Sequence, residues 1–210
     1  MKRSERLVDM TKYLMERPHT LIALPFFAKR YGAAKSSISE DLAILKHTLA
    51  SNQDGVLETV AGAAGGVRYI PFLGQKHAEK YLSDLSSRIE DPSRILAGGF
   101  VYLSDILGDT QDLRRIGELI ATRYAYEDVD AVMTVETKGI ALAQAIARYL
   151  NVPFVTARKR SKVTEGATVS VNYISSSLSR VSKMELPTRA LKKGSKVLIV
   201  DDFMKGGGTL

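Results

Sequence analysis

The sequence lacks cysteine altogether and has only three histidines among its 210 residues. Without cysteine, neither a disulfide framework nor a thiolate metal site can form. His19, His47 and His77 are scattered along the chain and form no cluster with acidic residues, so we expect no metal centre. No apolar run approaches the length needed to cross a bilayer, and we therefore expect no membrane contact.

The N-terminus, residues 1–6, is basic and has no apolar run behind it, so a signal peptide is not expected. Apolar residues make up 45% and charged residues 25% of the chain, as in an ordinary globular protein. This length suits one large domain or two small ones. These features together predict a cytoplasmic protein.

The formal net charge is +7, which favours a polyanionic partner. The basic residues fall in two clusters, one in the first third of the chain and one over residues 158–162. Since many basic proteins bind no nucleic acid, the charge alone decides little. Its division between two regions predicts two anionic ligands.

The first third has the pattern of three short helices followed by a hairpin. Residues 4–16 carry apolar side chains at helical spacing, and a second helix can begin at Pro25 and stop at Gly32. A third begins near Ser36 or Ser37, where Ser37 and Glu40 have the spacing of a capping box. Residues 56–60 and 67–70 are β-prone and flank a glycine-rich tip, which predicts a hairpin.

Three helices and a hairpin are the layout of a winged helix-turn-helix, in which the third helix reads base edges in the major groove. The N-terminal arm and the hairpin tip then contact phosphates. The predicted DNA-binding residues are Lys2, Arg3, Lys35, Ser36, Ser37, Ser39, Gly65 and Arg68. The same pattern also fits a small helical domain without a DNA function.

From residue 129 onward, strand-like runs alternate with helical ones. Residues 131–135, 152–157 and 196–200 are β-prone, residues 140–150 are helical, and residues 168–173 and 181–186 suit an antiparallel pair. This alternation predicts an α/β fold with a doubly wound parallel sheet and ligands at the carboxyl ends of its strands. We place the boundary between the two predicted domains at residues 74 and 75.

The loop after the last strand carries the strongest motif, Val200-Asp201-Asp202-Phe203-Met204-Lys205-Gly206-Gly207-Gly208-Thr209. Two carboxylates at the end of a strand can accept hydrogen bonds from a vicinal diol. The glycines let successive backbone amides point at one phosphate, and the threonine adds a hydroxyl. Side by side, the pair of carboxylates and the glycine-rich run fit the diol and the phosphate of a ribose 5-phosphate.

This run resembles the phosphoribosyl-pyrophosphate (PRPP) signature of the type I phosphoribosyltransferases. Residues 135–139 look like the pyrophosphate loop of that family, and residues 152–155 with Arg158 and Lys159 are similar to a segment of the adenine and xanthine enzymes. The resemblance implies that Asp201 and Asp202 bind the ribose hydroxyls. It further implies that Phe203, Met204, Lys205, Gly206, Gly207, Gly208 and Thr209 bind the 5-phosphate, and that Thr137, Lys138, Gly139, Arg158 and Lys159 meet the diphosphate.

Taken with the winged helix, the whole chain resembles the purine operon regulators of Gram-positive bacteria. The segments that carry this likeness include residues 34–41, 62–67, 98–105 and 162–166. The resemblance implies a homodimeric repressor-type transcription factor that binds operator DNA upstream of purine genes. PRPP, accompanied by Mg²⁺, would be its effector in a phosphoribosyltransferase-like site without catalysis.

Two other functions remain open: an active purine phosphoribosyltransferase with an accessory domain, and an RNA-binding attenuation protein that kept the fold. Lys205 stands where the transferases usually carry a small residue, which suits a sensor better than a turnover enzyme. The sequence stops at Leu210, inside the phosphate loop and before the helix that should follow it. We therefore expect a truncated chain whose loop binds phosphate weakly.

Overall fold

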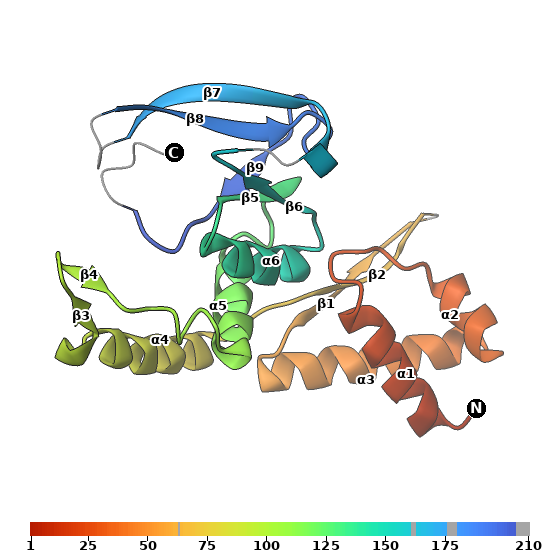
Figure 1. The fold of residues 1–210 in the computed structure, drawn as a ribbon. Helices are drawn as coiled ribbons and strands as arrows, with labels where there is room; N and C mark the ends of the chain where they lie inside the picture. The colour runs from red at the N-terminus through yellow and green to blue at the C-terminus, as the bar shows by residue number, and fades with distance from the viewer. Residues whose placement is uncertain (63, 161–162, 176–179, 205–210) are drawn as a thin grey trace. The chain divides into compact units, whose positions relative to one another are not determined.

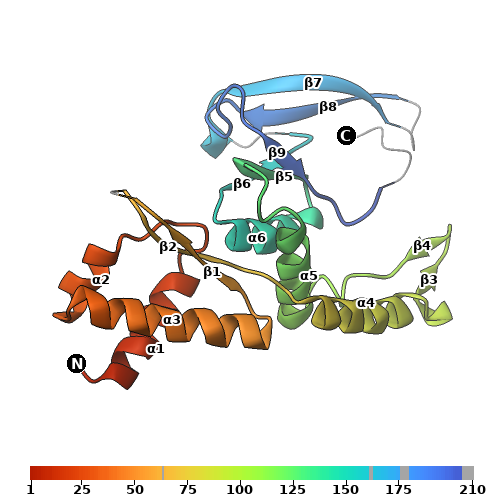
Figure 2. The same cartoon turned by 180° about the vertical axis from the view of Figure 1, so that it is seen from behind.

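The structure is a computed structural model that describes residues 1–62, 64–160, 163–175 and 180–204. Contacts between Cα atoms divide the chain into two compact units. The first comprises residues 1–88, 121–125 and 149–151, and the second comprises residues 89–120, 126–148 and 152–210. Figures 1 and 2 show their helices and strands from opposite sides.

Three helices open the first unit: α1 (Arg3–Met15), α2 (Leu24–Tyr31) and α3 (Lys35–Asn52). Their apolar faces meet in one core around Met10, Phe27 and Ile38, all with no exposed surface. The α2 helix has Pro25 as its second residue and is followed by its C-cap, Gly32, which adopts φ 59°. This positive φ is a conformation that favours glycine, so the predicted end of the second helix is confirmed, whereas its start lies one residue before the predicted Pro25.

The predicted capping box at the start of the third helix is wrong. The N-cap of α3 is Ala34, and no side chain caps it. Ser37 and Glu40 therefore lie inside the helix, because the first helical hydrogen bond already runs from the amide of Ile38 to the carbonyl of Ala34. Glu40 contacts Arg3 instead.

The predicted hairpin is present as β1 (Val56–Val60) and β2 (Gly66–Ile70), paired antiparallel. Its turn needs glycine because a Cβ on Gly65 would lie 2.3 Å from the carbonyl oxygen of Val60. A Cβ on Gly66 would lie equally close to the carbonyl oxygen of Ile22, at 2.3 Å. Ile22 forms a β-bridge with Val67, so the hairpin also pairs with the segment before α2.

After the hairpin, residues 71–74 lead into α4 (Gln75–Ile89), which has no buried residue. The second unit then contains the short helix η1 (Pro92–Arg94) and a hairpin of β3 (Ile95–Leu96) and β4 (Phe100–Val101). No pattern in the sequence predicts this hairpin. Its turn contains Gly98 and Gly99 with φ 83° and 75°.

A three-stranded parallel sheet with the order β6-β5-β9 forms the centre of the second unit. Its strands are β5 (Ala131–Val135), β6 (Phe154–Ala157) and β9 (Val197–Ile199), and α6 (Gly139–Leu150) connects the first two. The helix α5 (Thr110–Arg123) approaches α6 closely, since a Cβ on Gly117 would lie 2.9 Å from the carbonyl oxygen of Ala145. The expected parallel α/β sheet is thus confirmed.

The predicted antiparallel pair is a long two-stranded ribbon of β7 (Thr168–Ser175) and β8 (Arg180–Pro187), drawn in blue in Figure 1. The short helix η2 (Val163–Glu165) precedes it. The backbones of Arg158 and Glu185 exchange two hydrogen bonds of 2.9 and 2.7 Å. This pair joins the end of β6 to the ribbon.

Candidate functional sites

The third helix presents a small, polar face to solvent, as the sequence predicts. Lys35, Ser36 and Ser39 are exposed, and Ser37 is half-buried. Ile38, Leu42 and Leu45 on the other side are buried in the core. The hydroxyl of Ser39 donates to the carbonyl of Lys35 at 3.0 Å. The helix is thus held by its apolar side while its first turns are left accessible.

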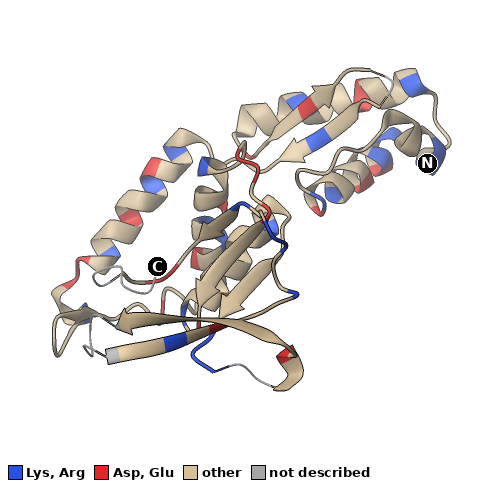
Figure 3. Ribbon diagram, turned by 90° about the horizontal axis from the view of Figure 1, so that it is seen from above, with Lys and Arg blue, Asp and Glu red and all other residues tan. Residues whose placement is uncertain are grey.

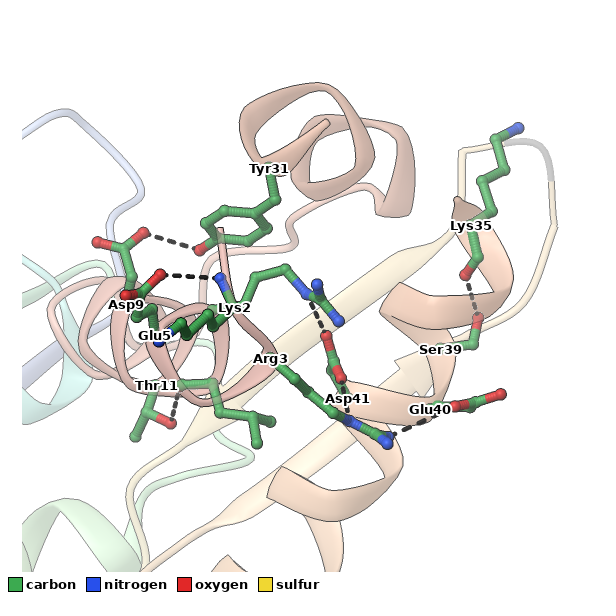
Figure 4. A network of polar contacts seen from close by, with 12 residues as sticks. Lys2, Arg3, Glu5, Asp9, Thr11, Tyr31, Lys35, Ser39, Glu40 and Asp41 are labelled. Carbon is green, nitrogen blue, oxygen red and sulfur yellow. Dashed lines mark hydrogen bonds and ion pairs between the residues drawn. The ribbon is translucent and has the colours of Figure 1, made fainter. Parts of the chain in front are cut away.

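A buried carboxylate that the sequence analysis missed ties α3 to α1. Asp41 has no exposed surface, and its two oxygens accept from Nε of Arg3 at 3.0 Å and Nε of Arg6 at 2.6 Å (Figure 4). The hydrogen bond that Arg6 donates to Asp41 raises the pKa of the Arg6 guanidinium. Breaking a buried ion pair costs several kcal/mol because one charge is left uncompensated. The signal for it was an acidic residue next to Leu42 on the apolar stripe.

Arg3 was predicted to contact phosphates, and the structure places it between two carboxylates. Besides Asp41, its Nη2 lies 3.4 Å from Oε2 of the exposed Glu40. The backbone amide of Lys2, the residue before it, donates to the side chain of Glu5 at 2.8 Å. Arg3 is therefore part of the junction between α1 and α3, with about half of its side chain exposed.

A second ionic contact joins α1 to α2. Asp9 accepts from Nε of Arg30 at 2.9 Å and from the hydroxyl of Tyr31 at 2.9 Å. The bonds from Arg30 and Tyr31 lower the pKa of Asp9. Burial, followed by the bond to Asp9, raises the pKa of Tyr31 to about 12. This network joins the C-terminal end of α2 to α1.

On the wing, the predicted DNA contact Arg68 lies opposite Glu58 in the hairpin register and donates to it at 2.7 Å. His19 lies nearby in a left-handed conformation, with φ 59°. Burial and the positive charge of Arg68 lower the pKa of His19. Glu58 thus compensates the charge of Arg68 within the wing.

Arginines and lysines of residues 1–74 have different roles. Each of the five arginines in this range pairs with a carboxylate: Arg3, Arg6, Arg17, Arg30 and Arg68. In the described part of the chain, four of the five lysines have no carboxylate within 4.0 Å: Lys2, Lys29, Lys35 and Lys46. Figure 3 shows acidic residues among the basic ones along the helix nearest the N-terminus. Among residues 1–74, lysines therefore supply the positive charge that no carboxylate compensates.

In the second unit, the predicted PRPP ligand Arg158 pairs with two carboxylates. Its Nη1 donates to Glu136 at 2.8 Å and its Nε donates to Glu165 at 2.8 Å. The bond to Glu136 is the main cause of the raised pKa of Arg158. The backbone amide of Lys159 donates to the other oxygen of Glu136 at 3.2 Å. Residues 158–159 thus lie beside the loop that begins at Glu136.

That loop leads through the exposed residues Thr137 and Lys138 to Gly139, the first residue of α6. The peptide bond between Glu136 and Thr137 is cis. A Cβ on Gly139 would lie 2.1 Å from Oγ1 of Thr134 and 3.0 Å from Oδ1 of Asp201. The structure therefore brings the predicted diphosphate loop next to the first of the two predicted ribose ligands.

Asp201 and Asp202 follow β9, as expected for ligands at the carboxyl end of a strand. The amide of Asp202 donates to Oδ1 of Asp201 at 2.9 Å. Burial and the neighbouring Asp202 raise the pKa of Asp201. Phe203 lies 6.3 Å from Phe100 between ring centroids, and Met204 is exposed. The other predicted phosphate ligands, Lys205, Gly206, Gly207, Gly208 and Thr209, lie outside the described residues.

The described ranges contain no group of three His, Cys, Asp or Glu residues that could hold a metal ion. Within the same ranges, no helix is both long and apolar enough to span a bilayer.

A winged-helix unit followed by a parallel sheet with these loops defines a class: transcriptional regulators built on a phosphoribosyltransferase fold. Residues 2–71 match the family described as bacterial purine repressor, N-terminal, and residues 104–210 match the phosphoribosyl transferase domain. The chain belongs to the family of the bacterial purine biosynthesis transcriptional regulators.

Its relatives include the purine biosynthesis transcriptional repressor PurR of Bacillus subtilis, 56% identical over 100% of this chain and 73% of the relative. The purine biosynthesis transcriptional activator PurR of Lactococcus lactis is 49% identical over 100% of this chain and 78% of the relative.

Among solved structures, the adenine phosphoribosyltransferase of Rhodothermus marinus is similar, with a TM-score of 0.52 and 25% identity. That similarity covers 62% of this chain and 74% of the enzyme. The enzyme of Saccharomyces cerevisiae shares the fold, with a TM-score of 0.52 and 21% identity over 62% of this chain and 76% of that chain.

Proposed function

We propose that the protein binds operator DNA upstream of purine biosynthesis genes through its first unit. The observation that carries this proposal is the exposed face of Lys35, Ser36 and Ser39 on a helix whose other side is buried. Such a helix can lie in a major groove while unpaired lysines meet phosphates. The protein would act in the cytoplasm, where bacterial DNA lies.

The test is binding to a duplex from the control region of a purine gene, compared with an unrelated duplex of equal length. We expect tighter binding to the first duplex, and a loss of affinity with rising salt, because lysine–phosphate contacts release counterions. Equal affinity for both duplexes would contradict operator recognition. Binding to RNA of the same sequence instead of DNA would favour the attenuation protein.

PRPP is the proposed effector of the second unit. Gly139 has no room for a side chain, because a Cβ there would lie 2.1 Å from Oγ1 of Thr134 and 3.0 Å from Oδ1 of Asp201, and this glycine therefore lets the loop that begins at Glu136 lie directly beside Asp201. Asp201 and Asp202 offer carboxylates to a diol, and oxygen ligands of this kind also suit the Mg²⁺ that accompanies a diphosphate. Thermal stabilisation by PRPP, absent with ribose 5-phosphate at the same concentration, would support this assignment.

The proposed regulator uses this site for sensing and not for transfer. The alternative, an active purine phosphoribosyltransferase, draws support from the similarity to adenine phosphoribosyltransferases. An assay of nucleotide formation from PRPP and a radiolabelled purine base separates the two. We expect no nucleotide to form at protein concentrations where PRPP changes DNA binding. Formation of nucleotide would favour the active phosphoribosyltransferase.

We further propose repression as the sign of regulation and a homodimer as the active form. Similar relatives include both a repressor and an activator, so a reporter gene behind the control region decides the sign.

For the dimer, α4 offers an amphipathic surface without a buried residue, on which Leu82 is 46% exposed. Leu82→Glu should lower the sedimentation coefficient if this surface is the interface, while Asp84→Glu on the same helix should not.

A further inference from the structure

One acidic side chain lies on the face of α3 that is proposed to enter the major groove. Glu40 follows Ser36 by four residues and precedes Ala43 by three, so the three share one side of the helix. The Glu40 side chain is 69% exposed. The other members of this face named above are neutral or basic, so a carboxylate here needs an explanation.

A role in stabilising the helix does not account for Glu40. Acidic residues favour the first turn of a helix, where they meet the positive end of its dipole, and the effect fades beyond that turn. Glu40 is the sixth residue of α3, whose first turn contains no acidic residue. Its partner in the described part of the chain, Nη2 of Arg3, lies 3.4 Å away, farther than the 3.0 Å between Arg3 and Asp41.

Arg3 makes this carboxylate tolerable near DNA. Asp41, fully buried, fixes Nε of Arg3 at 3.0 Å and thereby holds its guanidinium beside Glu40 (Figure 4). A positive charge at this distance offsets part of the repulsion between Glu40 and the phosphates. The two neighbouring acids thus differ in role: Asp41 positions Arg3, and Glu40 faces outward.

We propose that Glu40 is a specificity-determining residue that accepts a hydrogen bond from the N4 amino group of a cytosine. This inference rests on the proposed DNA binding by α3. An ionised carboxylate can only accept, and in the major groove only the amino groups of cytosine and adenine donate. Adenine also presents its N7 acceptor beside that donor, which repels a carboxylate, so cytosine is the better match.

The experiment uses the full chain and a duplex from the control region of a purine gene. Each cytosine of the site is replaced singly by thymine, which puts the O4 acceptor where the N4 donor was. Affinities are measured by fluorescence anisotropy at one salt concentration for the wild type, Glu40→Gln and Glu16→Gln. Glu16 is an exposed acid of the same unit, outside α3, so its variant controls for the change in charge.

We expect the wild type to lose about tenfold in affinity at one cytosine, the usual size of a good base contact. Glu40→Gln should lose this penalty, since the glutamine amide can donate to O4, whereas Glu16→Gln should retain it. Unchanged penalties at every cytosine in Glu40→Gln would overturn the proposal. So would an equal gain of affinity for specific and unrelated DNA, which would make Glu40 a source of repulsion alone.

The proposed function fails in a different way, because it requires the wild type to prefer the control region over unrelated DNA. Absence of that preference overturns DNA recognition itself, whatever Glu40 does. Equal melting temperatures of the wild type and Glu40→Gln, measured by circular dichroism, keep the comparison free of a folding effect. Glu40→Gln also keeps an oxygen acceptor for Arg3, which limits any disturbance of the junction with α1.

Discussion

Oδ1 of Asp201 lies 3.0 Å from the position that a Cβ would occupy on Gly139. The two residues come from segments 62 positions apart, the end of β9 and the start of α6. Their contact makes one site of two motifs that were separate in the sequence. An alanine at position 139 would add a single methyl group at this contact and would therefore test whether the two motifs form one site.

Gly139→Ala should remove the thermal stabilisation by PRPP, because the new Cβ would stand 2.1 Å from Oγ1 of Thr134. Ligand at 100 times its dissociation constant stabilises a protein by about 2.7 kcal/mol, so the loss is easily measured by thermal melting. Operator affinity without PRPP should remain. Gly117→Ala is the control: it crowds Ala145 instead, and should lower the melting temperature while the response to PRPP persists.

Asp41→Ala should destabilise the protein by about 3 kcal/mol, because it leaves the guanidinium of Arg6 without its buried partner. Glu40→Ala removes an exposed partner of the same arginine cluster and should cost less than about 1 kcal/mol. Urea unfolding followed by circular dichroism gives both values. Equal effects of the two variants would mean that burial of the ion pair does not matter.

His19 should make the stability of the first unit depend on pH. Its folded pKa is lowered by burial, so below about pH 6.5 the unfolded chain binds a proton that the folded chain does not. Stability is therefore retained above that pH and lost as the pH falls toward the lower folded pKa. His19→Asn removes the titration, and asparagine tolerates the positive φ. We expect a smaller decrease in melting temperature between pH 7 and 5 for this variant.

Lys35→Ala should weaken binding to specific and unrelated DNA alike. Each lysine–phosphate contact contributes about 0.9 to the slope of log affinity against log salt, so the variant should lose about that amount. The matched control is Lys12→Ala, since Lys12 lies on α1 and pairs with Glu16 at 3.8 Å. The slope is obtained by measuring DNA affinity at several salt concentrations between about 50 and 200 mM, a range over which affinity changes strongly. An unchanged slope for Lys35→Ala would remove this lysine from the interface.

Apolar periodicity and glycine positions predict several elements of both units. The ends of α2, the hairpin of β1 and β2, and the parallel strands β5, β6 and β9 all follow from such local patterns. The hairpin of β3 and β4 was missed because its strands have only two residues each, too few to show an alternation.

Ion pairs were beyond the reach of the sequence. Arg3 and Asp41 are 38 positions apart, and although Asp41 stands on the apolar stripe of α3, no local pattern identifies Arg3 as its partner. The predicted capping box was wrong because α3 already begins at Lys35, with Ala34 as its N-cap. Ser37 has the right spacing to Glu40 but lies inside the helix. The assignment of Arg158 to PRPP stays a prediction, with Glu136 and Glu165 as its present partners.

The ribbon of β7 and β8 has a consequence for handling the protein in solution. Within the described residues, β7 pairs with β8 alone, so the outer edge of β7 presents backbone amides and carbonyls to any extended chain. Val169, Val171 and Val181 are 56, 61 and 69% exposed beside it. Such an edge is a template for intermolecular sheet formation, and charges such as Lys183 oppose it. Concentrated samples should therefore aggregate through this ribbon first when its lysine is neutralised.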